Sequence, residues 1–229
     1  MLANDAAEDV LAVRSLVGVS LGVGEGDVGA SAAIGVHFLA VVPDTCVLAD
    51  AGSSLYFAPT ETSLKNLLNS GIQDKKNIYK TGNTVIDALQ TTVKADYEFA
   101  DAEFNKIFAR GNRLILVTTH RRENLGEPMR NVYKALRKVL ETHADVEAIF
   151  PVHKNPKVRE IVQEELGNLE RVHLIEPMDY EPFANLMGKV DIVLTDSGGI
   201  QEEAPALGKP VLVMRDTTER PEALEAGTV

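Results

Sequence analysis

The stretch Asp191-Ile192-Val193-Leu194-Thr195-Asp196-Ser197-Gly198-Gly199-Ile200-Gln201-Glu202-Glu203 is the part of the chain that best indicates its fold. Its first four residues predict a buried strand, and the segment from Gln201 to Leu207 predicts a helix that follows almost at once. The two glycines between them let the backbone approach a ligand closely, because no Cβ stands in the way. N–H groups at the start of a helix also bind anions. The turn therefore predicts a parallel α/β unit with a candidate phosphate site.

Two side chains extend this candidate site. Ser197 adds a hydroxyl donor, and Glu203 lies about one helical turn further on, where a carboxylate can accept hydrogen bonds from sugar hydroxyls. The combination suits a nucleoside diphosphate, with phosphates on the amides and ribose on the acid. The alternative is an ordinary glycine-containing turn with surface carboxylates, since short motifs often match by chance.

Strand and helix patterns alternate around this turn. Helical spacing of apolar residues follows Leu114–Val117, and Asn155-Pro156 and Gly167 are typical of a helix start and stop. Repeated βα units predict a Rossmann-like parallel sheet with helices on both faces. The expected strands are Leu114–Val117, Val146–Val152, Val172–Ile175, Asp191–Leu194 and Val211–Met214, and the expected helices include Tyr180–Lys189 and Gln201–Leu207.

Residues before this region are less regular. We expect a strand near Tyr56–Pro59, a helix to Ser70, a strand from Ile78, a helix over Thr84–Val93 and a solvated acidic surface over Asp96–Asp101. The first 50 residues show no clear alternation, so 1–54 is left unassigned and 55–229 is expected to form the ligand-binding domain. The segment Gly24–Gly29 matches G-x-G-x-x-G, but Glu25 and Asp27 would place negative charge where a pyrophosphate sits, which favours a flexible loop.

Composition narrows the function classes. The net charge of −11 argues against a general nucleic-acid partner, because phosphate backbones require clustered Lys and Arg. No run reaches the ~20 apolar residues of a membrane span, and the start lacks the basic region of a secretory signal. The single Cys46 permits no internal disulfide, so the cytoplasm is the expected location. The histidines show no metal-ligand spacing, and we expect neither metal nor cofactor.

Donor groups follow three more of the expected strands. His120, Arg121 and Arg122 come after Leu114–Val117, His153 ends the strand that begins at Val146, and Arg215 and Arg220 follow the last strand. In open α/β sheets, ligands bind at the carboxyl edge that these positions share. Each segment alone also reads as a surface loop with ion pairs. Together they predict an anionic ligand, with His120 able to donate a proton to a leaving oxygen.

These motifs resemble a known family. Thr119-His120-Arg121-Arg122-Glu123-Asn124, Pro151-Val152-His153, Thr195 to Pro205 and Arg215 to Glu222 are similar to the non-hydrolysing UDP-N-acetylglucosamine 2-epimerases, from about Leu55 to Val229. The resemblance implies two Rossmann-like domains facing a cleft, the GT-B arrangement, of which this chain corresponds to the C-terminal half. It implies a role in cell-envelope polysaccharide synthesis, and a homodimer is possible.

The resemblance also implies residue roles. His120, Ser197, Gly198 and Gly199 would contact the diphosphate, and Glu203 would hold the ribose. Phe183 would lie against the uracil, with Met178 contributing its backbone, and Arg220 would contact the substrate. Arg121 and His153 fall where bacterial relatives bind a second, activating UDP-GlcNAc.

The reaction implied is the interconversion of UDP-GlcNAc and UDP-ManNAc. The C2 proton has no adjacent carbonyl, so inversion is easiest by eliminating UDP across C1–C2 and adding it back. The acids that handle that proton belong to the family's N-terminal domain, which residues 1–50 do not resemble, and the chain stops before the helices that complete the fold. We therefore expect a fragment. The alternatives are a hydrolysing epimerase or other GT-B sugar-nucleotide enzyme, and a UDP-binding module without turnover.

Overall fold

The computed structural model describes residues 53–70, 72, 75–216, 218 and 220–229. The glycine-rich segment at 24–29 and Cys46 lie outside these residues. The first element described is a small parallel pair of strands, β1 (Tyr56–Ala58) and β2 (Ile78–Lys80), with helix α3 (Glu61–Asn69) packed on it and the 3-10 turn η1 (Lys75–Asn77) before β2. Its core is a cluster of its own, formed by Tyr56, Ala58 and Leu67. The range 55–229 thus contains two separate sheets.

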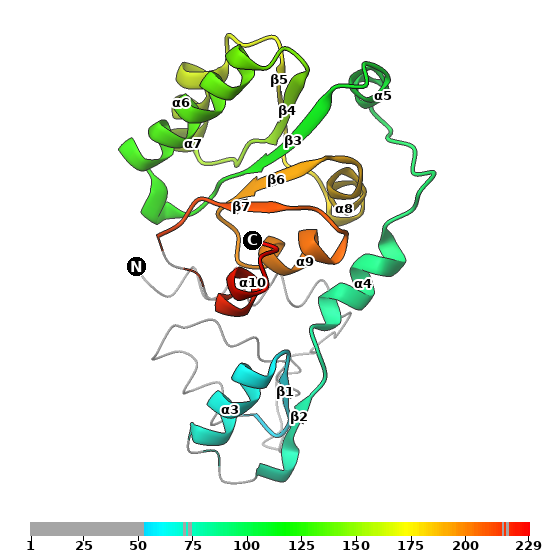
Figure 1. Cartoon of the computed structure of the whole chain (residues 1–229), viewed down its shortest axis with the longest axis vertical. Coiled ribbons are helices and arrows are strands. Elements are labelled where there is room, and N and C mark those ends of the chain that lie inside the picture. The colour runs from blue at the N-terminus through cyan, green and yellow to red at the C-terminus, as the bar shows by residue number, and fades with distance from the viewer. Residues whose placement is uncertain (1–52, 71, 73–74, 217, 219) are drawn as a thin grey trace, which may run out of the picture. The chain divides into compact units, whose positions relative to one another are not determined.

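The larger sheet has five strands in the order β5-β4-β3-β6-β7, all parallel (Figure 1). Its strands are β3 (Arg113–Thr118), β4 (Val146–Pro151), β5 (Val172–Ile175), β6 (Ile192–Thr195) and β7 (Val211–Val213). The chain builds outward from β3 to β5, then returns to place β6 on the other side of β3. The strands adjacent at this reversal, β3 and β6, define the topological switch point, where ligands bind in open α/β sheets.

Helices cover both faces of this sheet, as predicted. Leu114 and Leu116 of β3 face one cluster and Val117 faces the other, because side chains of a strand alternate. The second cluster is completed by α6 (Glu127–Thr142) and α7 (Pro156–Leu166). The first is completed by α4 (Thr84–Thr92), α5 (Ala102–Ala109), α8 (Tyr180–Lys189) and α9 (Ile200–Ala206). The Rossmann-like α/β class is therefore confirmed.

Helix α5 was not predicted. Asp101, placed in a solvated acidic surface, is its N-cap, and its carboxylate accepts a hydrogen bond from the backbone N–H of Glu103 at 2.9 Å. Phe99 in the same stretch is buried and stacks on Phe104, with ring centroids 4.7 Å apart. The stretch is thus a polar segment with one buried aromatic that anchors α5.

A short helix, α10 (Pro221–Glu225), follows β7, and a 3-10 turn, η2 (Arg122–Asn124), follows β3. In the part of the chain that the structure describes, no helix is both long enough and apolar enough to cross a bilayer.

Candidate functional site at the β3–β6 edge

The site begins where β3 and β6 leave the sheet together. Thr118 and Thr195, the last residues of the two strands, are register partners, and their hydroxyl oxygens lie 2.6 Å apart. The loop from Thr119 to Gly126 and the turn from Asp196 to Gly199 then diverge from this point. The four segments that carry the predicted donors follow the carboxyl ends of β3, β4, β6 and β7, as parallel strands require.

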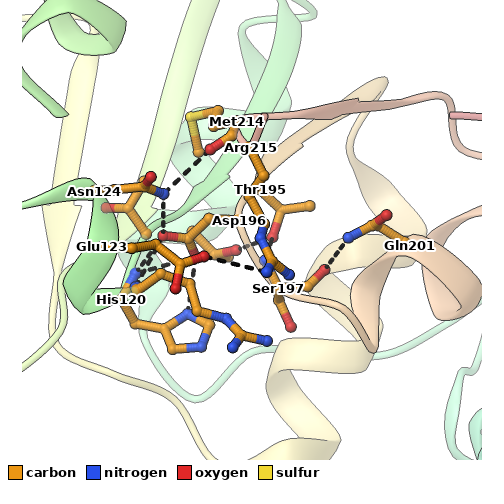
Figure 2. Close-up of polar contacts among 12 residues, drawn as sticks. His120, Glu123, Asn124, Thr195, Asp196, Ser197, Gln201, Met214 and Arg215 are labelled. Carbon is orange, nitrogen blue, oxygen red and sulfur yellow. Dashed lines mark hydrogen bonds and ion pairs between the residues drawn. The ribbon is translucent and has the colours of Figure 1, made fainter. Parts of the chain in front are cut away.

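Asp196 is the centre of the polar network at this edge (Figure 2). Its side chain is fully buried and accepts hydrogen bonds from the backbone N–H groups of His120, at 3.0 Å, and Arg121, at 2.9 Å. The side-chain amide of Asn124 donates to the same carboxylate at 3.2 Å and also to the carbonyl oxygen of Met214 at 3.1 Å. One buried carboxylate therefore holds the loop after β3 against β6, and Asn124 extends the link to the segment after β7.

The His120 ring is also held by this carboxylate. Its Nδ1 lies 3.0 Å from Oδ1 of Asp196, while 43% of the His120 side chain remains exposed. Burial acts to raise the pKa of Asp196, but the hydrogen bonds from the His120 ring and the Arg121 backbone outweigh it, so the pKa lies below its usual value. Asp196 is thus a carboxylate at neutral pH, and the imidazole faces outward from it.

The serine–glycine turn is open to solvent at its tip. Gly199 is exposed and Ser197 is half-buried, whereas Gly198 is buried. The backbone N–H of Ser197 donates to the Thr195 hydroxyl at 3.0 Å, and the Gln201 amide donates to the Ser197 carbonyl at 3.2 Å. Within the described residues, the N–H groups of Gly198 and Gly199 have no protein acceptor. The turn is fixed at its base and leaves two donors for a ligand.

Glu203 lies beside this turn. A Cβ built on Gly199 would stand 3.3 Å from its Oε1, so the carboxylate reaches back toward the start of α9. Burial raises the pKa of Glu203. The nearby Tyr180 hydroxyl is buried without a hydrogen-bond partner among the described residues, and burial, then the Glu203 charge, raise the pKa of Tyr180. A ligand hydroxyl would supply the partner that these groups lack.

Two further predicted residues lie at the beginning of α8. Met178 precedes the helix and Phe183 is in its first turn; both are half-buried and pack against the first core cluster. Packing of this kind leaves one part of each side chain accessible while fixing the rest.

Arg220 is held by Glu202. Its guanidinium Nε donates to Oε1 of Glu202, and the other carboxylate oxygen accepts from the side chain of Asn83. Burial lowers the pKa of Arg220, while the Glu222 charge opposes that shift.

His153 follows the carboxyl end of β4, and Arg121 follows His120 in the loop after β3. The His153 ring is exposed, its centroid is 6.4 Å from that of His120, and its Nδ1 accepts from the backbone N–H of Asn155 at 3.1 Å. The structure thus brings together the strand ends of β3 and β4 as predicted.

Two residues of the network, Asp196 and Asn124, stood in the quoted motifs without a role. Arg215, one of the predicted donors, forms an ion pair with Glu123 at 3.1 Å. The sequence feature that could have indicated a role for Asp196 is its position, directly after a buried strand and next to the serine–glycine turn.

Comparison with known proteins identifies the relatives of this arrangement. A family model described as UDP-N-acetylglucosamine 2-epimerase matches residues 46–229. The chain belongs to this family. The Bacillus subtilis UDP-N-acetylglucosamine 2-epimerase is 51% identical over 179 residues, which are 77% of this chain and 45% of that protein. The Escherichia coli K12 UDP-N-acetylglucosamine 2-epimerase is 49% identical over 187 residues, covering 76% of this chain and 47% of that protein.

Solved structures of related proteins show the same fold. The S. aureus MnaA-UDP co-structure matches with a TM-score of 0.72 and 46% identity, over 79% of this chain and 48% of that one. The Neisseria meningitidis UDP-GlcNAc 2-epimerase bound to UDP-GlcNAc matches with a TM-score of 0.67 and 44% identity, over 79% and 49%. The chain therefore spans about half the length of the epimerases that it matches.

Proposed function

We propose that this chain is the nucleotide-binding part of a UDP-N-acetylglucosamine 2-epimerase and binds UDP-GlcNAc or UDP at the β3–β6 edge. The observation that carries the proposal is the turn at Gly198 and Gly199, which is exposed at Gly199. Its two backbone N–H groups have no acceptor among the described residues and lie beside the strand end that bears His120 and its buried partner Asp196. Amides and an imidazole at a switch point are the donors that a pyrophosphate requires. Membership of the epimerase family, and relatives whose structures hold UDP or UDP-GlcNAc, support the choice of nucleotide.

Different residues bind different parts of the ligand. The diphosphate is bound by the amides of Gly198 and Gly199, the Ser197 hydroxyl and His120. Glu203 binds the ribose hydroxyls, and burial raises the pKa of this acid. Phe183 and the Met178 backbone take the uracil, and Arg220 takes the sugar side of the substrate.

The chemistry assigned to this half is leaving-group stabilisation. Elimination of UDP across C1–C2 breaks the bond between C1 and the phosphate oxygen and removes the C2 proton. Re-addition reverses both steps after the proton returns on the opposite face. The amides, His120 and Arg220 stabilise the charge that develops on the diphosphate. A carboxylate must handle the C2 proton, and by resemblance that carboxylate belongs to the family's N-terminal domain.

A UDP-binding module without turnover is the second candidate, because the residues assigned at the β3–β6 edge bind the nucleotide and none of them is assigned to the C2 proton. The experiment measures UDP binding to the purified chain by calorimetry and follows labelled UDP-GlcNAc in the same preparation. Conversion to UDP-ManNAc supports a complete epimerase, and binding without product supports the module. Free ManNAc as product would instead indicate the hydrolysing reaction, and absence of UDP binding would contradict both candidates.

Further expectations drawn from the sequence remain predictions. Arg121 and His153 are proposed to bind a second UDP-GlcNAc next to the first. The domain limits at 1–54 and 55–229 and a homodimer are expected from the family resemblance, and a cytoplasmic location is expected from the single cysteine, Cys46.

A further inference from the structure

We propose that Asp196 is a positioning residue that fixes which ring nitrogen of His120 carries the proton, and that binding of a nucleotide diphosphate at this site therefore takes up a proton. The first half of this inference concerns the protein alone. The second half rests on the proposed function, because it needs the diphosphate to meet the outward face of the His120 ring.

The two oxygens of Asp196 share the backbone N–H of His120, at 3.1 Å from Oδ1 and 3.0 Å from Oδ2, and otherwise have different partners. Oδ1 lies 3.0 Å from Nδ1 of His120, whereas Oδ2 accepts from the Arg121 backbone at 2.9 Å and from the Asn124 amide at 3.2 Å. A carboxylate only accepts hydrogen bonds, so Nδ1 of His120 must be the donor. A neutral imidazole has one N–H, and Nε2 is then an acceptor.

The outward Nε2 meets a ligand that is also an acceptor. Phosphate oxygens carry no proton at neutral pH in a diphosphate diester, so two acceptors would face each other while His120 is neutral. Protonation of Nε2 converts the contact into a charge-assisted hydrogen bond, which is stronger than a neutral one. Binding and protonation are therefore coupled, and each favours the other.

The charged groups around His120 come from several elements. Asp196, after β6, is within hydrogen-bond distance of the ring, and His153, after β4, is further away, with ring centroids 6.4 Å apart. Arg121 follows His120 in the same loop, and Glu123 of η2 pairs with Arg215, after β7, in the same network (Figure 2).

Asp196→Asn is the variant that separates the two functions of this carboxylate. The amide oxygen can take the place of Oδ2 and keep its acceptor role toward Asn124 and the backbone N–H groups of His120 and Arg121. The amide NH₂ then takes the place of Oδ1 and donates to Nδ1 of His120. The ring is forced into the Nε2–H tautomer, which donates to a phosphate without a second proton.

The first test is nuclear magnetic resonance of the ring nitrogens in the ligand-free protein, with the His120→Gln variant assigning the signals. We expect the Nδ1–H tautomer for neutral His120 in the wild type and the Nε2–H tautomer in Asp196→Asn. An Nε2–H tautomer in the wild type would overturn the inference, and this wild-type result decides even where the variant fails to fold.

The second test is calorimetry with UDP-GlcNAc in two buffers of different ionisation enthalpy. UDP itself is avoided because its terminal phosphate titrates near pH 6. As the pH is raised, we expect uptake that approaches one proton for each ligand and an affinity that falls by up to about tenfold per pH unit. In Asp196→Asn both effects should largely disappear, whereas Asp145→Asn, at the opposite edge of the sheet, should retain them.

The outcomes separate the two proposals. Wild-type binding without proton uptake, or uptake that Asp196→Asn leaves unchanged, overturns the coupling. Absence of UDP-GlcNAc binding contradicts the proposed function and with it the coupling, while the tautomer measurement still decides the role of Asp196.

Discussion

The side chain of Asn83 donates a hydrogen bond to Glu202, although 119 residues separate them in the sequence. Asn83 is also the N-cap of α4, where its side-chain oxygen accepts from the backbone N–H of Val85 at 3.1 Å. Glu202 lies in the first turn of α9, next to Glu203, and its other oxygen binds Arg220. One asparagine thus caps α4 and ties it to the helix that carries the proposed ribose acid.

Asn83→Asp should destabilise the protein by about 1–2 kcal/mol, because it keeps the cap but places a second carboxylate against Glu202. Asn155→Asp is the matched control. Asn155 caps α7 in the same way, with its side-chain oxygen accepting from Lys157 at 3.0 Å, but faces solvent. Urea unfolding should show a loss for the first variant and little change for the second; equal losses would indicate that only capping matters at Asn83.

A second prediction concerns the buried Glu147 on β4. Its carboxylate accepts from Arg110 at 2.8 Å and from Asn112 at 2.6 Å, and lies 2.5 Å from Nε2 of His173. Glu147→Gln removes the charge that these donors face, so we expect a loss of about 2 kcal/mol in the free energy of unfolding. Glu103→Gln, which removes an exposed ion pair with Lys106, should change it little.

The same residue predicts acid sensitivity. Burial acts to raise the pKa of Glu147, but the hydrogen bonds from His173 and Asn112 and the charge of Arg110 hold it below its ordinary value of 4.5. The stability from this group is present above that value and is lost as pH falls through the lower folded pKa. Unfolding free energies measured between pH 6 and pH 3 should therefore fall less steeply in Glu147→Gln than in the wild type. Parallel curves would show that Glu147 has no part in acid unfolding.

Much of the fold was predictable because apolar runs and breakers are local signals. The strands at Val172–Ile175 and near Val211, and the helix Tyr180–Lys189, follow directly from them. Helix α5 was missed because its N-cap, Asp101, ends an acidic stretch that resembles surface, and the burial of Phe99 depends on contacts that no local pattern contains.

The candidate site was predictable as a list of residues but not as an arrangement. The serine–glycine turn and His120 are visible as strand-end motifs. That β6 lies next to β3 follows from the chain reversal after β5, which the sequence pattern does not specify. Only this adjacency brings Asp196 to His120 across 76 residues, so its role required coordinates.

Gly199→Ala should separate binding from stability. Gly199 has φ −65°, which alanine adopts without strain, so the fold should keep its stability. Its new Cβ would stand 3.3 Å from Oε1 of Glu203 and displace that carboxylate, so UDP affinity should fall by at least about fivefold, or about 1 kcal/mol.

Gly111→Ala gives the reverse control. Gly111 has φ +70°, and a Cβ added there would meet open space. Alanine at this position should lower the free energy of unfolding by about 1 kcal/mol because of the backbone conformation, while UDP affinity stays unchanged. Calorimetry and thermal unfolding of both variants check the pair. If the Gly199→Ala protein binds UDP as tightly as the wild type, Glu203 does not belong to the UDP site.

The central claim is that the turn after β6 and the imidazole after β3 hold a pyrophosphate together. Calorimetric titration of UDP into the Ser197→Ala, His120→Ala double variant tests it most directly, with circular dichroism to confirm the fold. We predict that UDP affinity falls by at least about a hundredfold, or about 2.7 kcal/mol, because two direct phosphate donors are lost. A correctly folded double variant that binds UDP as tightly as the wild type would contradict the account.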